Sequence, residues 1–421
     1  MHILIIHQAF ASLNEPGGTR HYEFARQLVA RGHKVTVIAS PVSYITGTIS
    51  PLLEGEGAGV RVIRASVYSA HHKSFFHRAI AFFSFMFSSF FIGLKVKHVD
   101  LVWGTSPPIF QGVTAWALAR IKRVPFLFEV RDLWPKFAIA VGVLKNPVLI
   151  RLTEWLERFL YRGADRVMVN SPGFVAHVES ALSGAMSASR EAKSHRPKGR
   201  SGKGGGAKRV ELIPNGADPS MFDPNDDGAE FRRIHKLEDK FVALYAGAHG
   251  MSNDLGVVLD AASKLADSKV QIVLLGDGKE KPALQARAAE MKLTNVTFLP
   301  SVPKTGMPSA LAGADACIAI LKPLEEYKTT YPNKVFDYMA AARPVALAID
   351  GVIREVVEAA GCGFFAEPGN AAALADVISR LAENKAQARE MGIKGRKYLE
   401  HHFSREWIAE QLVSLLEKMA G

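Results

Sequence analysis

Residues 329–347, TTYPNKVFDYMAAARPVAL, open with a polar turn, continue as a short helix and end with a proline before a new apolar strand. A helix that leads directly into an apolar strand is the repeating unit of a parallel sheet covered by helices. Lys334 and Asp337 are three positions apart in the opening turns, so they share one face of that helix. The backbone N–H groups at such a helix end favour anions. A lysine and a carboxylate placed there suit a ligand that is both anionic and rich in hydroxyls, as a nucleotide sugar is.

The same unit recurs along the whole chain. Short apolar runs alternate with helical segments, which predicts parallel, doubly wound sheets. In the first half the runs are HILIIH, KVTVIAS, VRVIRAS, DLVWGTS, PFLFEV, RVMVNS and RVELIPNG. After a polar, proline-punctuated connector at residues 216–240, the pattern restarts with FVALYAGA, VQIVLLGDG, NVTFLP, ACIAIL and PVALAI. We therefore expect an α/β fold of two Rossmann-like halves, followed by a final helix with Ser404 as its N-cap.

The composition fits a folded protein with two domains. The chain has 421 residues, of which 48% are hydrophobic and 22% are charged, and this length exceeds one ordinary domain of about 150 to 200 residues. Cys317 and Cys362 are the only cysteines, which excludes a disulfide framework and fits a reducing compartment. The first residues, MHILIIHQAF, lack the features of a signal peptide, so we expect a cytoplasmic location.

Most of the net charge of +11 lies in one insert, at about residues 183–208. Between Ala181 and Arg209 the chain carries eight lysines and arginines, counting Arg209, against Glu191 alone. The stretch is rich in Ser, Gly and Lys and nearly free of apolar residues, which predicts a flexible loop. Nucleic acid, anionic lipid headgroups and plain solvent all stay open as its surroundings.

One segment is too apolar for an ordinary surface helix. Residues 79–94, AIAFFSFMFSSFFIGL, carry no charge, and His77, Arg78, Lys95 and Lys97 flank them. As a helix the segment would span about 24 Å, short of the ~30 Å hydrocarbon core of a bilayer. Two interpretations stay open. The helix lies at a membrane interface with its phenylalanines in the lipid, or it is buried in the first domain.

Three strand-to-helix turns contain glycines. Gly17 and Gly18 precede the first helix. In the second half, Gly247 follows the first strand and Gly276 follows the next one. Glycines let a backbone loop approach a ligand closely, and a helix N-terminus behind the loop favours an anion. No GxGxxG follows the first strand and no GxxxxGK[ST] occurs, so the dinucleotide and P-loop fingerprints are missing.

The stretch FEVRDLWP, residues 128–135, places Glu129, Arg131, Asp132 and Trp134 at the end of a predicted strand. Ligand clefts of open α/β sheets form at the carboxyl ends of strands. Burying charges costs free energy, so a cluster of charges and an indole at this place indicates a site. The alternative is a structural ion pair between Arg131 and a neighbouring carboxylate.

Together these motifs resemble the retaining GT-B glycosyltransferases of family 4. The resemblance is greatest to the WbuB-like O-antigen transferases, which use UDP-N-acetylhexosamines such as UDP-N-acetyl-fucosamine (FucNAc). It covers nearly the whole chain except the basic insert, through GGTRHYEFARQLVARGHKVTVIAS, SPP, FEVRDLWP, LIPNGAD, YAGAHG, LLGDG and YPNKVFDYMAAARPV. It implies an acceptor-binding domain at 1–222, a nucleotide-sugar-binding domain at 223–402, and a helix at 403–421 that crosses back to the first domain.

The resemblance also implies a donor site. The Glu-x7-Glu pair of the family falls on Thr329 and Asp337, so the acid that grips the ribose hydroxyls is kept as an aspartate, while the acid on the sugar side is missing. The diphosphate-binding Arg and Lys of the family fall near the neutral Ala248 and Asn253, which leaves Lys334 and backbone amides to stabilise the phosphates. The whole expected set, with His249 as a further phosphate contact, is Gly17, Gly18, Gly247, His249, Gly276, Val302, Asn333, Lys334 and Asp337.

The implied chemistry needs neither a metal nor a cofactor besides the UDP-sugar. In this family the new bond forms on the face that UDP leaves, and a leaving-phosphate oxygen accepts the proton of the acceptor. Glu129, Arg131 and Asp132 are the expected catalytic residues, which would orient the acceptor hydroxyl or stabilise the developing positive sugar. The expected acceptor is a saccharide on undecaprenyl diphosphate at the inner face of the cell membrane, where the enzyme would bind anionic lipid peripherally and would not bind nucleic acid.

Two other functions stay as alternatives. A nucleotide-cofactor oxidoreductase is suggested by the fold alone, which does not fix function, and its fingerprint is missing. A non-catalytic membrane-associated binding protein would account for the basic insert and the apolar segment. It would leave FEVRDLWP and YPNKVFDYMA unexplained.

Overall fold

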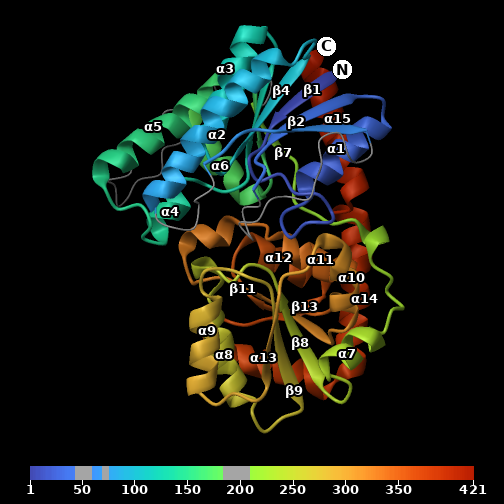
Figure 1. Ribbon diagram of the computed structural model, residues 1–421. Coiled ribbons are helices and arrows are strands. Elements are labelled where there is room, and N and C mark those ends of the chain that lie inside the picture. The colour runs from blue at the N-terminus through green and yellow to red at the C-terminus, as the bar shows by residue number, and fades with distance from the viewer. Residues whose placement is uncertain (43–58, 69–74, 184–208) are drawn as a thin grey trace, which may run out of the picture.

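The computed structural model describes residues 1–42, 59–68, 75–183 and 209–421. Within these ranges the chain forms two α/β domains, one above the other in Figure 1, each built on a parallel sheet. The predicted fold class, two Rossmann-like doubly wound halves, is confirmed. The basic insert predicted at about residues 183–208 lies, beyond Ser183, outside the described residues.

The first sheet has seven strands in the order β3-β2-β1-β4-β5-β6-β7. All neighbours pair in parallel, and every strand falls on a predicted apolar run. Helices cover both faces of the sheet, so its strands need apolar residues on both sides and read as continuous runs. The strands are β1 (His2–Ile6), β2 (Lys34–Ala39), β3 (Val60–Arg64), β4 (Leu101–Ser106), β5 (Phe126–Val130), β6 (Arg166–Val169) and β7 (Val210–Leu212).

Two layers of helices cover this sheet. One face carries α1 (Arg20–Ala30) and, from the other end of the chain, α15 (Arg405–Ala420). The opposite face carries the remaining helices of the domain. They are α2 (Phe75–Lys95), α3 (Phe110–Lys122), α5 (Pro147–Gly163) and α6 (Val175–Ser183), with the short α4 (Lys136–Ala140) between β5 and α5.

The second sheet has six parallel strands in the order β10-β9-β8-β11-β12-β13. Five of them match predicted runs. The sixth, β13, has only the three residues GFF, all partly exposed, so no apolar run marks it in the sequence. The strands are β8 (Phe241–Ala246), β9 (Val270–Leu275), β10 (Val296–Leu299), β11 (Ala316–Ile320), β12 (Val345–Ala348) and β13 (Gly363–Phe365).

Helices again lie on both faces of the second sheet. One face carries α8 (Leu255–Lys264), α9 (Lys281–Glu290) and α13 (Ala371–Glu383). The other carries α7 (Ala229–His235), α10 (Met307–Ala312), α11 (Asn333–Ala340) and α12 (Val352–Ala360). Helix α14 (Lys385–His402) contributes to both cores, through Ala388 and Met391 on the first face and Leu399 on the second. The segment 329–347 forms α11 and β12 as predicted, so α11 begins at the edge of the sheet that faces the first domain (Figure 1).

The end of the chain joins the two domains. Helix α14 packs on the second domain, and α15 continues upward along the first domain, at the right of Figure 1. The predicted N-cap is confirmed, since the hydroxyl of Ser404 accepts a hydrogen bond from the backbone N–H of Trp407 at 3.4 Å. The last helix thereby adds its apolar side to the core of the first domain.

Helix α2 extends the predicted apolar helix at residues 79–94 to Phe75–Lys95. Phe85 is fully buried against the first sheet, whereas Phe83, Phe87 and Phe91 are exposed. The interpretation of this segment as a wholly buried helix is therefore wrong for its outer side. In the part of the chain that the structure describes, no helix combines the length and the apolar character needed to cross a membrane.

Candidate active site

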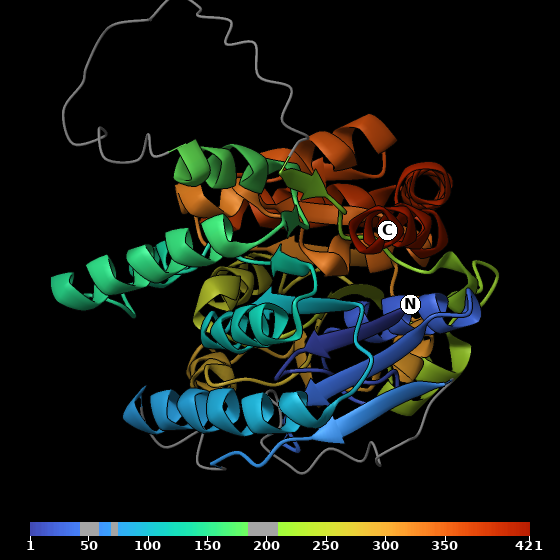
Figure 2. The ribbon, with the colours of Figure 1, turned by 90° about the horizontal axis from the view of Figure 1, so that it is seen from above.

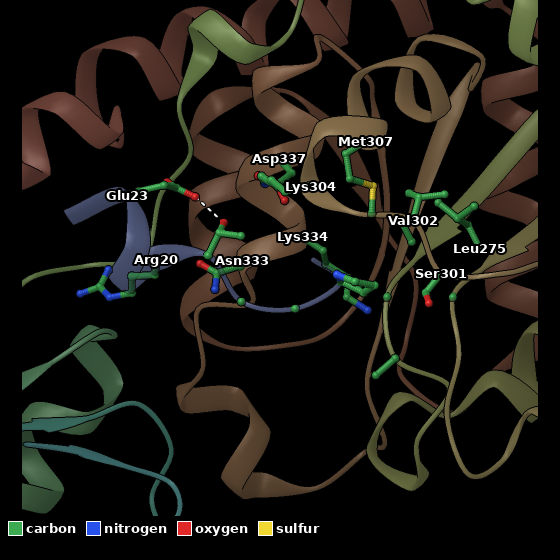
Figure 3. A pocket seen from close by; sticks show the side chains of 18 of the residues that line it. Arg20, Glu23, Leu275, Ser301, Val302, Lys304, Met307, Asn333, Lys334 and Asp337 are labelled. Atoms are coloured by element: carbon green, nitrogen blue, oxygen red, sulfur yellow. Dashed lines mark hydrogen bonds and ion pairs between the residues drawn. The ribbon is translucent and has the colours of Figure 1, made fainter. Parts of the chain in front are cut away.

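A cavity of about 230 Å³ lies between the two domains, where the carboxyl ends of both sheets face each other. The first domain contributes the loop after β1 and the start of α1. The second contributes the turns after β8, β9 and β10 and the first turn of α11. Figure 3 shows Lys304, Lys334 and Asp337 directed into the space between these loops.

Eight of the nine predicted donor-site residues line this cavity. They come from five separate segments that only the fold brings together. The eight are Gly17, Gly18, Gly247, Gly276, Val302, Asn333, Lys334 and Asp337.

Two of the glycine turns touch each other at the cavity wall. Gly276 has a φ of +149°, and a Cβ atom there would lie 1.8 Å from the carbonyl oxygen of Gly247. Gly247 has a φ of +148°, and a Cβ on it would lie 2.9 Å from the Nζ of Lys334. Any side chain at Gly276 would force the two loops apart. The wall is therefore bare backbone, which suits close approach of a phosphate.

Lys334 brings an unpaired cation to this wall. Its Nζ lies 3.8 Å from the centroid of the Tyr245 ring and 3.5 Å from Oδ1 of Asn253. No ion pair with a carboxylate holds it within the described residues. Burial lowers the pKa of its ammonium to about 7, because the site withdraws the charge from water without supplying a counter-ion. An anion in the cavity would supply it.

Asp337 is held by a lysine that the sequence analysis missed. The Nζ of Lys304 lies 2.5 Å from Oδ1 of Asp337, and both side chains are largely buried. Burial raises the pKa of the Asp337 carboxyl, and the charge of Lys304 offsets part of that rise. Lys304 follows β10, as Gly247 follows β8 and Gly276 follows β9. Its position after a strand's carboxyl end was the signal available in the sequence.

A second ion pair closes the other side of the cavity. Nε of Arg405, on α15, lies 2.5 Å from Oε2 of Glu23, on α1, and Nη2 donates to the carbonyl of Gly216 at 2.5 Å. Burial would raise the pKa of Glu23, but the charges of Arg405 and Lys304 lower it to about 2. Glu23 and Arg405 are 382 positions apart in the chain. No local pattern could have indicated this pair.

Glu129 lies beneath the site and does not line the cavity. Its carboxylate accepts from Nε of Arg20 at 3.0 Å, from Nε2 of His21 at 2.5 Å and from the indole N–H of Trp103 at 3.2 Å. Burial would raise the pKa of Glu129, yet His21 and Arg20 lower it well below its usual range. Because Arg20 and His21 open α1, Glu129 anchors the loop of Gly17 that precedes this helix.

The other two predicted catalytic residues are not lining residues of this cavity either. Nη2 of Arg131 donates to the carbonyl of Pro107 at 2.7 Å, and its Nε donates to that of Ser106 at 3.3 Å. The alternative interpretation of Arg131 as half of a structural ion pair is wrong, since no such pair holds it within the described residues. Its guanidinium instead fixes the loop after β4.

Asp132 is the free carboxylate of this group. Within the described residues no hydrogen bond or ion pair holds its side-chain oxygens, and it is partly exposed. Burial raises the pKa of its carboxyl to about 6, and the neighbouring Arg131 offsets part of the rise. The negative charge of Asp132 also acts on Tyr327 of the second domain. Asp132 therefore lies where the two domains approach each other.

His249 lies behind the glycine wall and does not line the cavity. Its ring is fully buried, and neither ring nitrogen has a partner among the described residues. Burial, with the charge of Lys281, lowers the pKa of the imidazole to about 4. A neutral ring behind the wall adds no positive charge to the empty cavity, and the expected contact between His249 and a phosphate stays a prediction. Lys334 is left as the unpaired cation of this wall.

No cluster of three or more His, Cys, Asp or Glu side chains suited to hold a metal ion occurs in residues 1–42, 59–68, 75–183 and 209–421.

Two family descriptions match the chain, one in each domain. "Glycosyl transferase 4-like domain" matches residues 17–188, and "Glycosyl transferases group 1" matches residues 240–384. Among curated proteins, the chain is similar to the "Putative colanic acid biosynthesis glycosyl transferase WcaI" of Escherichia coli K12. The two are 23% identical over 332 residues, which cover 76% of each chain.

Solved structures share the whole fold. The sucrose-phosphate synthase of Thermosynechococcus elongatus superposes with a TM-score of 0.77 at 19% identity, over 99% of both chains. HepE of Anabaena, solved in complex with UDP and glucose, superposes with a TM-score of 0.70 at 17% identity, over 99% of this chain and 100% of HepE. These likenesses extend over both domains.

Proposed function

The chain belongs to the GT-B glycosyltransferases of family 4, and glycosyltransferase descriptions match both of its domains. From this premise we propose that it transfers a sugar from a UDP-sugar to a saccharide acceptor. The observation that carries the proposal is that Asp337 and Lys334 lie together on the opening turns of α11 and line the cavity. Asp337 is a carboxylate suited to bind ribose hydroxyls, and Lys334 is a cation without a carboxylate partner among the described residues. Both line the same cavity as Gly17 and Gly18 of the first domain.

The donor nucleotide lies in the cavity with its ribose at Asp337. The carboxylate accepts hydrogen bonds from the ribose hydroxyls, which are charge-assisted and therefore strong. The diphosphate lies against Lys334 and the backbone amides around Gly17, Gly18 and Gly247. HepE, a protein of the same fold, has been solved with UDP and glucose, which supports a UDP-sugar as the donor class.

The chemistry proceeds with retention at the sugar carbon. The bond to UDP breaks as the acceptor oxygen approaches from the same face, and an oxygen of the departing phosphate takes the acceptor's proton. The charge on UDP grows in this step, and the ammonium of Lys334 stabilises it. Asp132 orients the acceptor hydroxyl, while Arg131 and Glu129 hold the loops that place it. Backbone dipoles and Lys334 stabilise the negative charge on the departing UDP, so the proposal includes no metal ion and no further cofactor.

The acceptor is a lipid-linked saccharide, and the product belongs to a surface polysaccharide such as an O-antigen or capsule. The relative named for colanic acid biosynthesis supports this class of product. The transferred sugar is an N-acetylhexosamine such as FucNAc. This part of the proposal rests on the motifs that resemble those of the WbuB-like transferases. The enzyme acts in the cytoplasm at the inner face of the membrane. The oxidoreductase and the non-catalytic binding protein gain no support from the comparisons.

Purified protein tests the proposal directly. UDP should raise the thermal midpoint of unfolding, and NAD should not, because only a ligand of the native state stabilises it. A set of UDP-sugars is then incubated with the protein and an isoprenyl-diphosphate-linked saccharide, and released UDP and lengthened acceptor are measured. UDP-N-acetylhexosamines should give the most product. Stabilisation by NAD but not UDP, with no release from any UDP-sugar, would overturn the proposal.

A further inference from the structure

The helices α2, α3 and α5 present one apolar, cationic outer surface on the first domain. All three pack on the same face of the first sheet, and Figures 1 and 2 both show α5 reaching out beyond the body of the domain. We call their outward-facing side chains the aromatic face. Its exposed apolar members include Phe83, Phe87 and Phe91 on α2, Ile121 on α3, and Val148, Leu149, Leu152 and Trp155 on α5.

Helix α5 carries a complete apolar stripe that the sequence analysis did not identify. Val148, Leu152 and Trp155 are spaced at i, i+4 and i+7, so they share one side of the helix. They are 70%, 56% and 56% exposed. A soluble surface normally scatters such residues singly, and a gathered set marks a contact surface. No described element of the chain covers this stripe.

The stripe is also rigid, which lowers the entropy lost when it binds. Asn146 caps the helix, because its Oδ1 accepts from the backbone N–H of Val148 at 2.9 Å. The Trp155 ring stacks on Phe159 at 5.5 Å, and Phe159 packs edge-on against Trp116 of α3 at 4.8 Å. These ring contacts tie the outward side of α5 to α3.

Cations outnumber acids beside the apolar stripe. Arg151, Arg158 and Arg162 lie on α5. Its only two acids are Glu154 and Glu157, and Glu157 is buried, bound to Tyr161 and His177. Helices α2 and α3 add Lys95, Arg120 and Lys122, and neither helix contains an acid.

We propose that the aromatic face docks on the surface of an anionic lipid bilayer, with α5 as its principal contact. The proposal rests on the proposed function, in which the acceptor is anchored in a membrane. A helix with one apolar side, a tryptophan near its middle and arginines beside it matches the two layers of a bilayer surface. The apolar residues enter the acyl boundary and the arginines meet anionic headgroups. A second copy of the chain would instead place these cations against each other.

Sedimentation with vesicles tests the surface. Wild-type protein is mixed with vesicles of phosphatidylglycerol and phosphatidylcholine, or of phosphatidylcholine alone. We expect binding only where phosphatidylglycerol is present. The variant Leu152→Ser/Trp155→Ser should reduce that binding by on the order of tenfold or more, because it removes two large apolar contacts. Arg151→Gln/Arg162→Gln should also reduce it, and should lessen its dependence on salt.

Matched variants distinguish a specific loss of membrane binding from a general effect on folding. Trp407 is 45% exposed on α15, which packs on the opposite face of the sheet, so Trp407→Ser should bind vesicles as the wild type does. The substituted residues are exposed, so circular dichroism and the UDP affinity should stay unchanged in all variants. UDP binding reports the donor site alone, which keeps the two proposals distinguishable.

Two results would overturn the inference. One is vesicle binding that is absent in the wild type or unchanged in the Leu152→Ser/Trp155→Ser variant. The other is a wild-type dimer in light scattering that this variant converts to monomer, which would assign the face to a second copy of the chain. In either case an intact response to UDP would leave the proposed transferase standing.

Discussion

The Nζ of Lys304 lies 2.5 Å from Oδ1 of Asp337, so the carboxylate assigned to the ribose hydroxyls is already oriented by a cation. The pair has one free side, because Lys304 contacts a single carboxylate oxygen. A carboxylate can accept several hydrogen bonds at once. Lys304 therefore orients Asp337 and favours its ionised form, and the second carboxylate oxygen stays available for the proposed ribose.

Replacing Asp337 with alanine should weaken UDP binding by roughly 1.5 to 3 kcal/mol, the range for hydrogen bonds to a charged group. Uridine should lose a similar amount, because it carries the same ribose. Isothermal titration calorimetry measures both. The variant Lys304→Met and the double variant complete a cycle, in which the two effects should not add, since the residues are in contact. An unchanged dissociation constant for UDP in Asp337→Ala would remove Asp337 from the ribose site.

Replacing Lys334 with methionine should weaken UDP binding far more than uridine binding, because only UDP carries the diphosphate. The wild-type ammonium has a pKa of about 7 in the empty site. The bound diphosphate favours the charged form, so binding takes up a proton above this pH. The affinity for UDP should therefore fall as the pH rises above about 7 in the wild type, and stay flat there in Lys334→Met. Equal losses for uridine and UDP would make Lys334 a structural residue.

Asp132→Asn should lower the rate of transfer by about 100-fold, the scale of misplacing a reacting group, while the UDP dissociation constant stays unchanged. The wild-type carboxyl has a pKa of about 6. If its ionised form orients the acceptor, the wild-type rate falls as the pH drops below about 6, and this fall is missing in the variant. Steady-state rates across pH check both points. A variant with full activity would take Asp132 out of the reaction.

Glu129→Gln should destabilise the fold by about 3 to 5 kcal/mol, because it leaves the buried Arg20 without its counter-charge. Chemical denaturation measures this loss. Glu154 on α5 is a matched control, since it is partly exposed, and its change to Gln should cost less than about 0.5 kcal/mol. A Glu129→Gln protein that keeps its stability but loses transfer would instead place Glu129 in the chemistry.

The fold could be predicted from the sequence because buried parallel strands leave a continuous apolar signal. The runs HILIIH and FVALYAGA became the central strands β1 and β8. The strand β13 was missed for the same physical reason. It lies at the edge of its sheet, has three residues and is only partly buried, so packing imposed no apolar run on it.

The site could be predicted only where its residues belong to one local pattern. Lys334 and Asp337 stand on one helix, and the glycines stand in turns. The pair of Glu23 and Arg405 depends on how α15 returns to the first domain. Within FEVRDLWP, strand alternation could not tell that Glu129 points into the core while Asp132 stays partly exposed and, among the described residues, unpaired.

The return of α15 also sets an order of events during synthesis. Ile408, Leu412 and Leu416 of α15 pack with Phe24 and Leu28 of α1 on one face of the first sheet. Translation adds about 5 to 20 residues per second, so roughly 10 to 40 s separate the last strand of this sheet from the helix that completes its core. Throughout that interval the nascent first domain exposes an apolar face at the ribosome. We therefore expect the nascent chain to need chaperones until α15 emerges.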